Sequence, residues 1–200
     1  MIHGDEPESG TLARDWLHRL SELEPRNQWR VVPILNPDGW EKNTRGNANG
    51  VDLNRNFPTQ DWTKNAHLFW KKMAGSHPRR FPGHTAGSEP EVRCAMSLIE
   101  EFKPDLIVSI HTPYGLLDFD GPVTSLPRVN GLPARRLGNF PGSLGRFMWA
   151  DRNIPVLTIE LQAKLLELEQ ADKLQDSIGD LAVRINRKLA ASPTPNKKQP

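Results

Sequence analysis

The chain has 200 residues, which is enough for one domain with a substantial hydrophobic core. Its 26 basic and 24 acidic residues give a formal net charge of +2, which argues against a protein that binds nucleic acid or another polyanion. The single cysteine, Cys94, excludes an internal disulfide and a zinc site built from several cysteines. No apolar run reaches membrane-spanning length. We therefore expect a monomeric globular domain without a membrane span.

Four segments have the apolar spacing of amphipathic helices. In the first, Ser9 is placed to act as a cap. Another begins at the sequence SEPE, where a hydroxyl, a proline and two acids favour a first helical turn. Cys94 falls within the apolar pattern of that helix, so we expect its thiol to be buried and unreactive. The predicted helices cover residues 8–23, 61–73, 88–102 and 164–189.

Three short apolar runs predict buried strands, at residues 30–35, 106–110 and 156–161. Helices that alternate with short buried strands indicate an α/β fold with a mixed sheet. We expect this single domain to occupy residues 1–190. The tail, residues 191–200, is polar and rich in proline, and we expect it to be disordered.

The loop from Asn36 to Phe57 concentrates polar groups directly after the first predicted strand. It opens with the turn composition NPDG and carries Arg45, Asn54 and Arg55, with Asp52 among the asparagines. Two guanidinium groups and an amide suit an anionic ligand, because an arginine meets a carboxylate with two parallel hydrogen bonds. A solvated loop with surface arginines is the alternative, and the density of such residues in one loop argues against it.

His3, Glu6 and His111 form a candidate metal site. His3 and Glu6 are three residues apart, so both can face one ion in a tight turn, and His111 ends the strand predicted at 106–110. Two histidines and one glutamate form a known catalytic zinc set that leaves one coordination position open. The alternatives are a hydrogen-bonded core histidine at position 111 and a helix N-terminal acid at position 6. The pattern predicts one Zn²⁺ per chain.

Hydrolysis at such a site also needs a base, and Glu160 is the candidate. It lies in the apolar run IPVLTIEL, where a carboxylate facing the core is costly unless it meets a charge or a metal site. The alternative is a strand residue that faces solvent.

Six motifs in chain order carry a resemblance to a known family: HGDE, NPDGW, GVDLNRNF, SIH, PGSLG and TIEL. Together they resemble the zinc carboxypeptidases of the carboxypeptidase A type, and most closely the bacterial murein peptide amidases. The resemblance runs from His3 to about Leu161 and implies a mixed, mostly parallel twisted sheet flanked by helices. Family members place one or more core strands ahead of the histidine that matches His3. We therefore expect an N-terminally truncated chain that lacks the first strand or strands.

The resemblance also implies roles for single residues. Glu160 matches the catalytic glutamate, which favours it over a solvent-facing strand residue. Arg45 matches the arginine that stabilises the oxyanion, and Asp52 the carboxylate that orients a metal-bound histidine, here His3.

The substrate-binding residues follow from the same resemblance. Asn54 and Arg55 match the pair that holds the terminal carboxylate, and Ser143 and Leu144 match the segment that lines the pocket for the terminal side chain. One family feature has no match. The family's mobile tyrosine is replaced here by the sequence LGNF, residues 137–140, and Tyr114 is not its equivalent.

These observations predict a zinc-dependent metallocarboxypeptidase or peptide amidase that hydrolyses the C-terminal amide bond of short peptides with a free terminal carboxylate. The resemblance implies murein peptides as substrates and a bacterial protein of the cytoplasm or periplasm. An alternative of another class is an N-acyl amino acid deacylase of the aspartoacylase and succinylglutamate desuccinylase type, which shares the HxxE pair, the later histidine and a DLNR loop. A third alternative is a truncated, inactive domain that only binds peptides. The NPDGW and GSLG motifs favour the first prediction.

Overall fold

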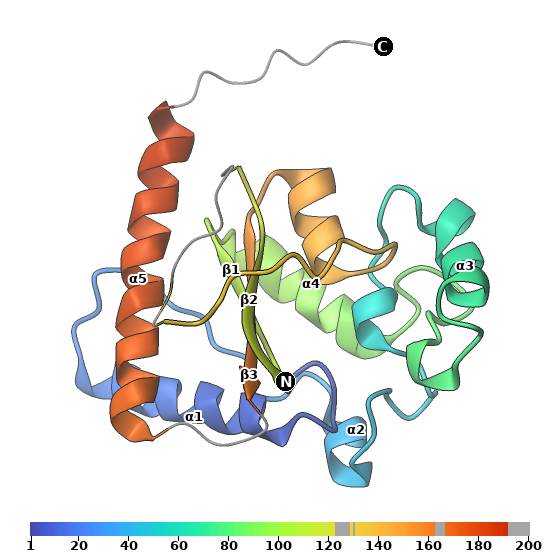
Figure 1. The fold of residues 1–200 in the computed structure, drawn as a ribbon, viewed down its shortest axis with the longest axis horizontal. Coiled ribbons are helices and arrows are strands. Elements are labelled where there is room, and N and C mark those ends of the chain that lie inside the picture. Colours follow the sequence, from blue (N-terminus) through green and yellow to red (C-terminus); the bar gives the residue numbers. More distant parts are fainter. Residues whose placement is uncertain (123–128, 130, 163–166, 192–200) are drawn as a thin grey trace.

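A three-stranded sheet with the strand order β1-β3-β2 lies at the centre of the computed structural model (Figure 1). The structure describes residues 1–122, 129, 131–162 and 167–191. β1 (Ile107–His111) is parallel to β3 (Val156–Gln162), and β2 (Tyr114–Asp120) is antiparallel to β3. The predicted α/β class with a mixed sheet is thereby confirmed, as are the two predicted strands that became β1 and β3.

Helices flank this sheet. Figure 1 shows α1 and α5 together on one side of the molecule, with α4 and α3 toward the other. The helices are α1 (Pro7–Glu22), α2 (Pro37–Lys42), α3 (Trp62–Lys72), α4 (Pro90–Phe102) and α5 (Leu168–Ala191). Three shorter turns complete the described elements: η1 (Leu53–Arg55), η2 (Pro78–Arg80) and the π-helical η3 (Arg146–Ala150).

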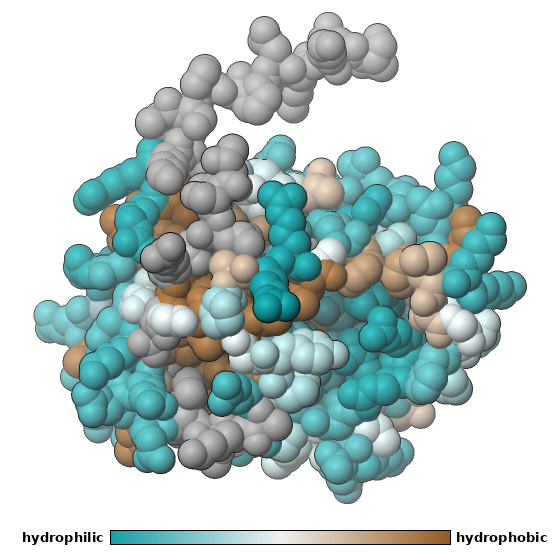
Figure 2. Space-filling view, viewed as in Figure 1, coloured by the Kyte–Doolittle hydropathy of each residue, from teal (hydrophilic) through white to brown (hydrophobic). Residues whose placement is uncertain are grey.

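Two hydrophobic clusters hold the layers together. The first joins α1 and α5 to β2 and β3, through residues such as Trp16, Leu157 and Ile178. The second joins α4 and η3 to the sheet around Val92 and Phe147. Figure 2 shows one face of the molecule, where hydrophilic residues cover most of the surface and apolar residues come into view mainly over the sheet and beside α5.

The prediction of a strand at residues 30–35 is wrong, because this run belongs to no strand. Within the described residues its backbone exchanges two hydrogen bonds with Met1, through Pro33 O and Leu35 N. Pro33 has no N–H to donate to a ladder. Residues of the run and of β1 line an apolar cavity of about 250 Å³.

The sequence did not predict β2, because residues 114–120 contain a glycine and two aspartates, which are uncommon in strands. Asp118 is buried, and hydrogen bonds offset the cost of burying its charge. Its carboxylate accepts hydrogen bonds from the backbone N–H groups of Phe119 and Leu137. A buried acid in this strand is thus tolerated because both oxygens have donors.

Local details of the predicted helices also differ. Ser9 does not cap α1, which begins at Pro7; its hydroxyl donates to the Glu6 carbonyl at 2.7 Å. Cys94 is exposed, contrary to the prediction. Val92, two residues earlier, is fully buried. Two helical residues correspond to a rotation of about 200°, so Cys94 lies on the opposite face of the helix.

The sequence NPDG begins a helix rather than only a turn. Asn36 caps α2, because its Oδ1 accepts a hydrogen bond from Gly39 N at 2.9 Å, and Pro37 stands at the first helical position. Residues 164–166 of the last predicted helix and residues 192–200 of the predicted tail lie outside the described residues. None of the helices within the described part of the chain is long and apolar enough to cross a membrane.

Candidate metal and catalytic site

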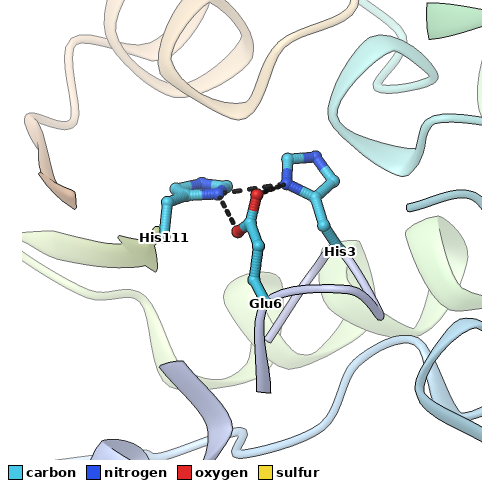
Figure 3. A group of neighbouring side chains, drawn as sticks. All are labelled: His3, Glu6 and His111. Atoms are coloured by element: carbon cyan, nitrogen blue, oxygen red, sulfur yellow. Dashed lines mark hydrogen bonds and ion pairs between the residues drawn. The ribbon is translucent and has the colours of Figure 1, made fainter. Parts of the chain in front are cut away.

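His3, Glu6 and His111 meet in one buried cluster (Figure 3). His3 Nδ1 lies 2.8 Å from Glu6 Oε1, and His111 Nδ1 lies 2.8 Å from Glu6 Oε2. The two histidine Nδ1 atoms are 3.2 Å apart. The three candidate ligand atoms therefore converge on a single point, although their residues come from the chain's first turn and from the end of a strand.

The local sequence explains how His3 and Glu6 come to face one another. Gly4 passes so close to α2 that a Cβ at this position would lie 1.9 Å from the Gly39 backbone. The tight passage turns the chain directly ahead of α1, where Glu6 is the residue before the first helical turn. The contact therefore requires a glycine at position 4 of the HGDE motif.

The donor set fits zinc. Imidazole nitrogens and a carboxylate are zinc's usual ligands, and the ligand atoms of a tetrahedral site with bonds of about 2.0–2.1 Å are roughly 3.3 Å apart. Each imidazole Nδ1 lies 2.8 Å from a different oxygen of Glu6, and the two Nδ1 atoms are 3.2 Å apart. With one ligand atom taken from each residue, all three lie within 4.8 Å of one another, so one ion can contact all three side chains. Three protein groups leave a fourth position for water or substrate, as in catalytic rather than structural zinc sites.

Each imidazole has a partner on its other nitrogen. Asp52 Oδ1 lies 3.2 Å from His3 Nε2, and Ser109 Oγ lies 3.0 Å from His111 Nε2. Such partners fix the orientation of a histidine and therefore the direction of its free nitrogen. Sequence reasoning missed Ser109, although its place two residues before His111 puts both side chains on one face of β1.

Arg45 links the two acids of the cluster. Its Nε donates to Asp52 Oδ2 at 2.9 Å, and its Nη1 lies 3.5 Å from Glu6 Oε1. Burial by itself would raise the pKa of Asp52, but Arg45 and His3 hold it well below its usual range. Burial opposes ionisation of Glu6 too, yet the two histidines lower the pKa of its carboxyl group far below the ordinary value. Both acids are therefore anionic near neutral pH, which suits a cation.

Glu160 lies in β3 directly beside His111, because these two residues are register partners in the parallel pair of strands. Its side chain is buried, with 8% exposure, and Oε2 has no hydrogen-bond partner among the residues that the structure describes. Burial, with the negative charge of Glu6, raises the pKa of Glu160 to about 7. A carboxylate of this kind can exchange protons near neutral pH.

Asn54 and Arg55 lie in η1, immediately after Asp52. Arg55 is 7% exposed and its Nη1 donates to Asn54 O at 2.6 Å. Its buried Nε has no hydrogen-bond partner in the part of the chain that the structure describes. Burial lowers the pKa of Arg55, although the nearby Asp52 works against the shift. A buried guanidinium with an unused donor is suited to an anion.

Ser143 and Leu144 lie next to this loop, although they follow it by about 90 residues in the sequence. Leu144 N donates to Asn54 Oδ1 at 2.8 Å, and Ser143 Oγ accepts a hydrogen bond from Arg146 N. Ser143 is the last residue of the turn Phe140-Pro141-Gly142-Ser143, which its N–H closes by donating to Phe140 O at 3.0 Å, and Leu144 follows the turn. The structure thus brings every residue singled out from the sequence to one region. Tyr114, by contrast, opens β2 and is 64% exposed.

A buried cluster of two histidines and a glutamate at the carboxyl end of a parallel strand, with a second carboxylate alongside, defines a metallohydrolase type of site. The chain belongs to the zinc carboxypeptidase family, which it matches over residues 12–117, more than half of its length. That match includes Arg45, Asp52, Arg55 and His111.

Individual relatives agree with this family. The chain is 32% identical over 169 residues to murein peptide amidase A of Escherichia coli K12, covering 79% of this chain and 67% of the relative. It is 35% identical over 143 residues to the murein peptide amidase A of Vibrio campbellii, covering 66% of this chain and 55% of the relative. The chain thus spans between about half and two thirds of these relatives.

Solved structures have the same fold. Murein-tripeptide amidase MpaA from Escherichia coli O157 superimposes with a TM-score of 0.63 at 29% identity, over 90% of this chain and 77% of that one. Bovine thrombin-activatable fibrinolysis inhibitor, solved with a tick carboxypeptidase inhibitor, gives a TM-score of 0.67 at 17% identity over 94% of this chain and 80% of that one, and it supports the fold alone.

Proposed function

We propose that this protein is a zinc-dependent peptidase that removes the C-terminal residue of short peptides by hydrolysing the last amide bond. The observation that carries the proposal is the buried cluster of His3, Glu6 and His111, whose ligand atoms lie within 4.8 Å of one another, together with a second site suited to an anion around Arg55. A carboxypeptidase needs a metal-binding site and a carboxylate-binding arginine close together, because the bond to be cut lies one residue from the substrate's terminal charge.

His3, Glu6 and His111 would hold the zinc ion, with Asp52 and Ser109 orienting the two imidazoles. A bound zinc ion supplies Lewis acidity toward a carbonyl oxygen and lowers the pKa of water. Glu160 removes a proton from the attacking water and delivers it to the nitrogen of the leaving amine. The raised pKa of Glu160, about 7, supports this role, because a general base works best when its pKa lies near the working pH.

Arg45 stabilises the negative charge that develops on the carbonyl oxygen. The position of Arg45 supports this role. Asp52 and Glu6 hold its guanidinium within the cluster, so the guanidinium is oriented before the substrate binds. Asn54 and Arg55 bind the terminal carboxylate. Ser143 and Leu144 line the space for the terminal side chain, and Leu144 N donates to Asn54 Oδ1. The likeness to murein peptide amidases supports bacterial cell-wall peptides as the substrate class, and hence a bacterial cytoplasm or periplasm as the place of action.

A three-substrate comparison tests the proposal. The zinc-loaded protein is assayed with a short peptide that has a free C-terminal carboxylate, with the same peptide amidated at its C-terminus, and with N-acyl amino acids. We expect release of the last residue from the free acid only. Preferred cleavage of the N-acyl amino acids would identify a deacylase, and equal cleavage of acid and amide would exclude a carboxylate-binding role for Arg55.

A further inference from the structure

The aromatic ring of Phe140 lies against the guanidinium of Arg55, with the ring centroid 4.8 Å from Arg55 Cζ. This is the distance of a cation–π interaction, in which the negative face of the ring attracts the cation. No catalytic or binding role so far involves Phe140. The two residues are 85 positions apart, so a specific backbone arrangement is needed to bring them together.

The backbone around Phe140 is fixed to the backbone around Arg55. A Cβ added at Gly142 would lie 1.9 Å from the Arg55 carbonyl oxygen, so the turn that begins at Phe140 has no room for any other residue there. Gly142 O accepts a hydrogen bond from Phe57 N at 3.0 Å, and Gly142 N donates to Thr59 Oγ1 at 3.1 Å. The turn cannot shift without breaking these contacts.

The ring itself is also supported. Phe69 of α3 packs against Phe140 with centroids 5.0 Å apart. At Gly138 a Cβ would come within 2.9 Å of Phe140 Cζ, so this glycine leaves the ring its space. Because the backbone of Phe140 is fixed and its ring packs against Phe69, the ring holds a defined position next to the guanidinium.

Few polar groups orient the Arg55 guanidinium, so the contact with the Phe140 ring matters for its position. Among the described residues, its Nη1 donates to Asn54 O, and its buried Nε has no hydrogen-bond partner. An aromatic ring orients a guanidinium without occupying its N–H groups, which point outward in the plane of the group. The ring also excludes water from one side of the cation, which strengthens the attraction of the remaining donors for an anion.

We propose that Phe140 is a positioning residue that holds Arg55 ready for the substrate's terminal carboxylate and thereby sets the preference for the free acid. The inference rests on the proposed function, in which Arg55 binds that carboxylate. Since Arg55 binds the carboxylate equally in the ground state and the transition state, loss of the ring raises KM and leaves kcat nearly unchanged.

The test compares Phe140→Leu and Phe140→Met, which remove the ring, with Phe140→Trp, which keeps one. Phe102→Leu is the matched control, because it removes a ring that lies 5.3 Å from Arg30 Cζ, at a different cation–π pair. We expect KM for a peptide acid to rise about 3- to 30-fold in the Leu and Met variants, the range that loss of a cation–π contact allows. Phe140→Trp and Phe102→Leu should keep KM within about twofold of the unmodified protein by the same reasoning.

A binding measurement separates the inference from the proposed function. Calorimetry on zinc-free protein compares an N-acetylated dipeptide acid with its amide. If the unmodified protein prefers the acid and the ring-free variants lose that preference, the inference is supported. If those variants bind the acid as well as the unmodified protein does, the inference is overturned and the proposed function stands. If the unmodified protein does not prefer the acid, both are overturned.

Discussion

His111 and Glu160 face one another as register partners across the parallel strands β1 and β3. Side chains at paired positions of neighbouring strands project from the same face of a sheet, so a candidate metal ligand and the candidate base share one location by virtue of strand pairing alone. The carboxyl ends of parallel strands are where α/β proteins place their ligands. The relationship also allows the roles of the two residues to be separated by experiment.

The first prediction concerns metal content. His111→Ala removes one of three candidate ligands, and we expect purified protein to lose most of its zinc, because two remaining ligands bind weakly. His84→Ala changes an exposed histidine and should retain one zinc ion per chain. Metal analysis by mass spectrometry after dialysis gives the comparison. Equal zinc in the two variants would remove His111 from the site.

The second prediction tests Glu160 as the base. Glu160→Gln keeps the size of the side chain but cannot accept the proton, so turnover should fall by roughly a hundredfold or more, the usual scale of general base catalysis. Zinc content should stay the same, since the three candidate ligands are intact. Glu100→Gln, on the exposed face of α4, is the control and should have normal turnover. Zinc loss in the Glu160 variant would make it a ligand instead.

The third prediction links the same residue to stability. The folded protein raises the pKa of Glu160 from 4.5 to about 7, so between these pH values the folded state binds more protons than the unfolded state. Stability from this group is therefore present below pH 4.5 and lost as pH rises through 7. In zinc-free protein, Glu160→Gln should gain up to about 3 kcal/mol over the unmodified protein at pH 8. Urea denaturation at pH 4.5 and 8 measures this, and an equal difference at both values would contradict it.

The fourth prediction concerns the partner of His111. Ser109→Ala removes the hydroxyl group next to Nε2 and should weaken zinc binding about 10- to 100-fold, as loss of such partners usually does. Ser97→Ala, at an exposed position of α4, should bind zinc normally. Competition with a chromogenic chelator gives both affinities. Unchanged affinity in Ser109→Ala would mean that other contacts orient the imidazole.

The site was more predictable from the sequence than parts of the fold. His3, Glu6 and Glu160 belong to short motifs whose chemistry is visible in the residue types. The run at residues 30–35 and the strand β2 were assigned wrongly or missed, because strand formation depends on a partner that local composition does not reveal. Residues 30–35 have strand-forming side chains but no ladder, whereas β2 has two aspartates and glycine but pairs along its length with β3.

The contact between Phe140 and Arg55 illustrates a second limit. Nothing in the local sequence of either residue indicates it, since it depends on Gly142 passing against the Arg55 backbone. Ser109 is different, because its spacing from His111 is a readable signal. Contacts within one strand follow from the period of that strand, and contacts between distant loops do not.

The cluster of His3, Glu6 and His111 joins the first turn of the chain to a strand more than a hundred residues later. A metal ion held there would act as a reversible cross-link that closes most of the sequence into a single loop. The strength of that cross-link would depend on free zinc, because a ligand that binds only the folded state stabilises it in proportion to the logarithm of its concentration. Resistance to unfolding would therefore rise with the concentration of free zinc and fall when a chelator is added.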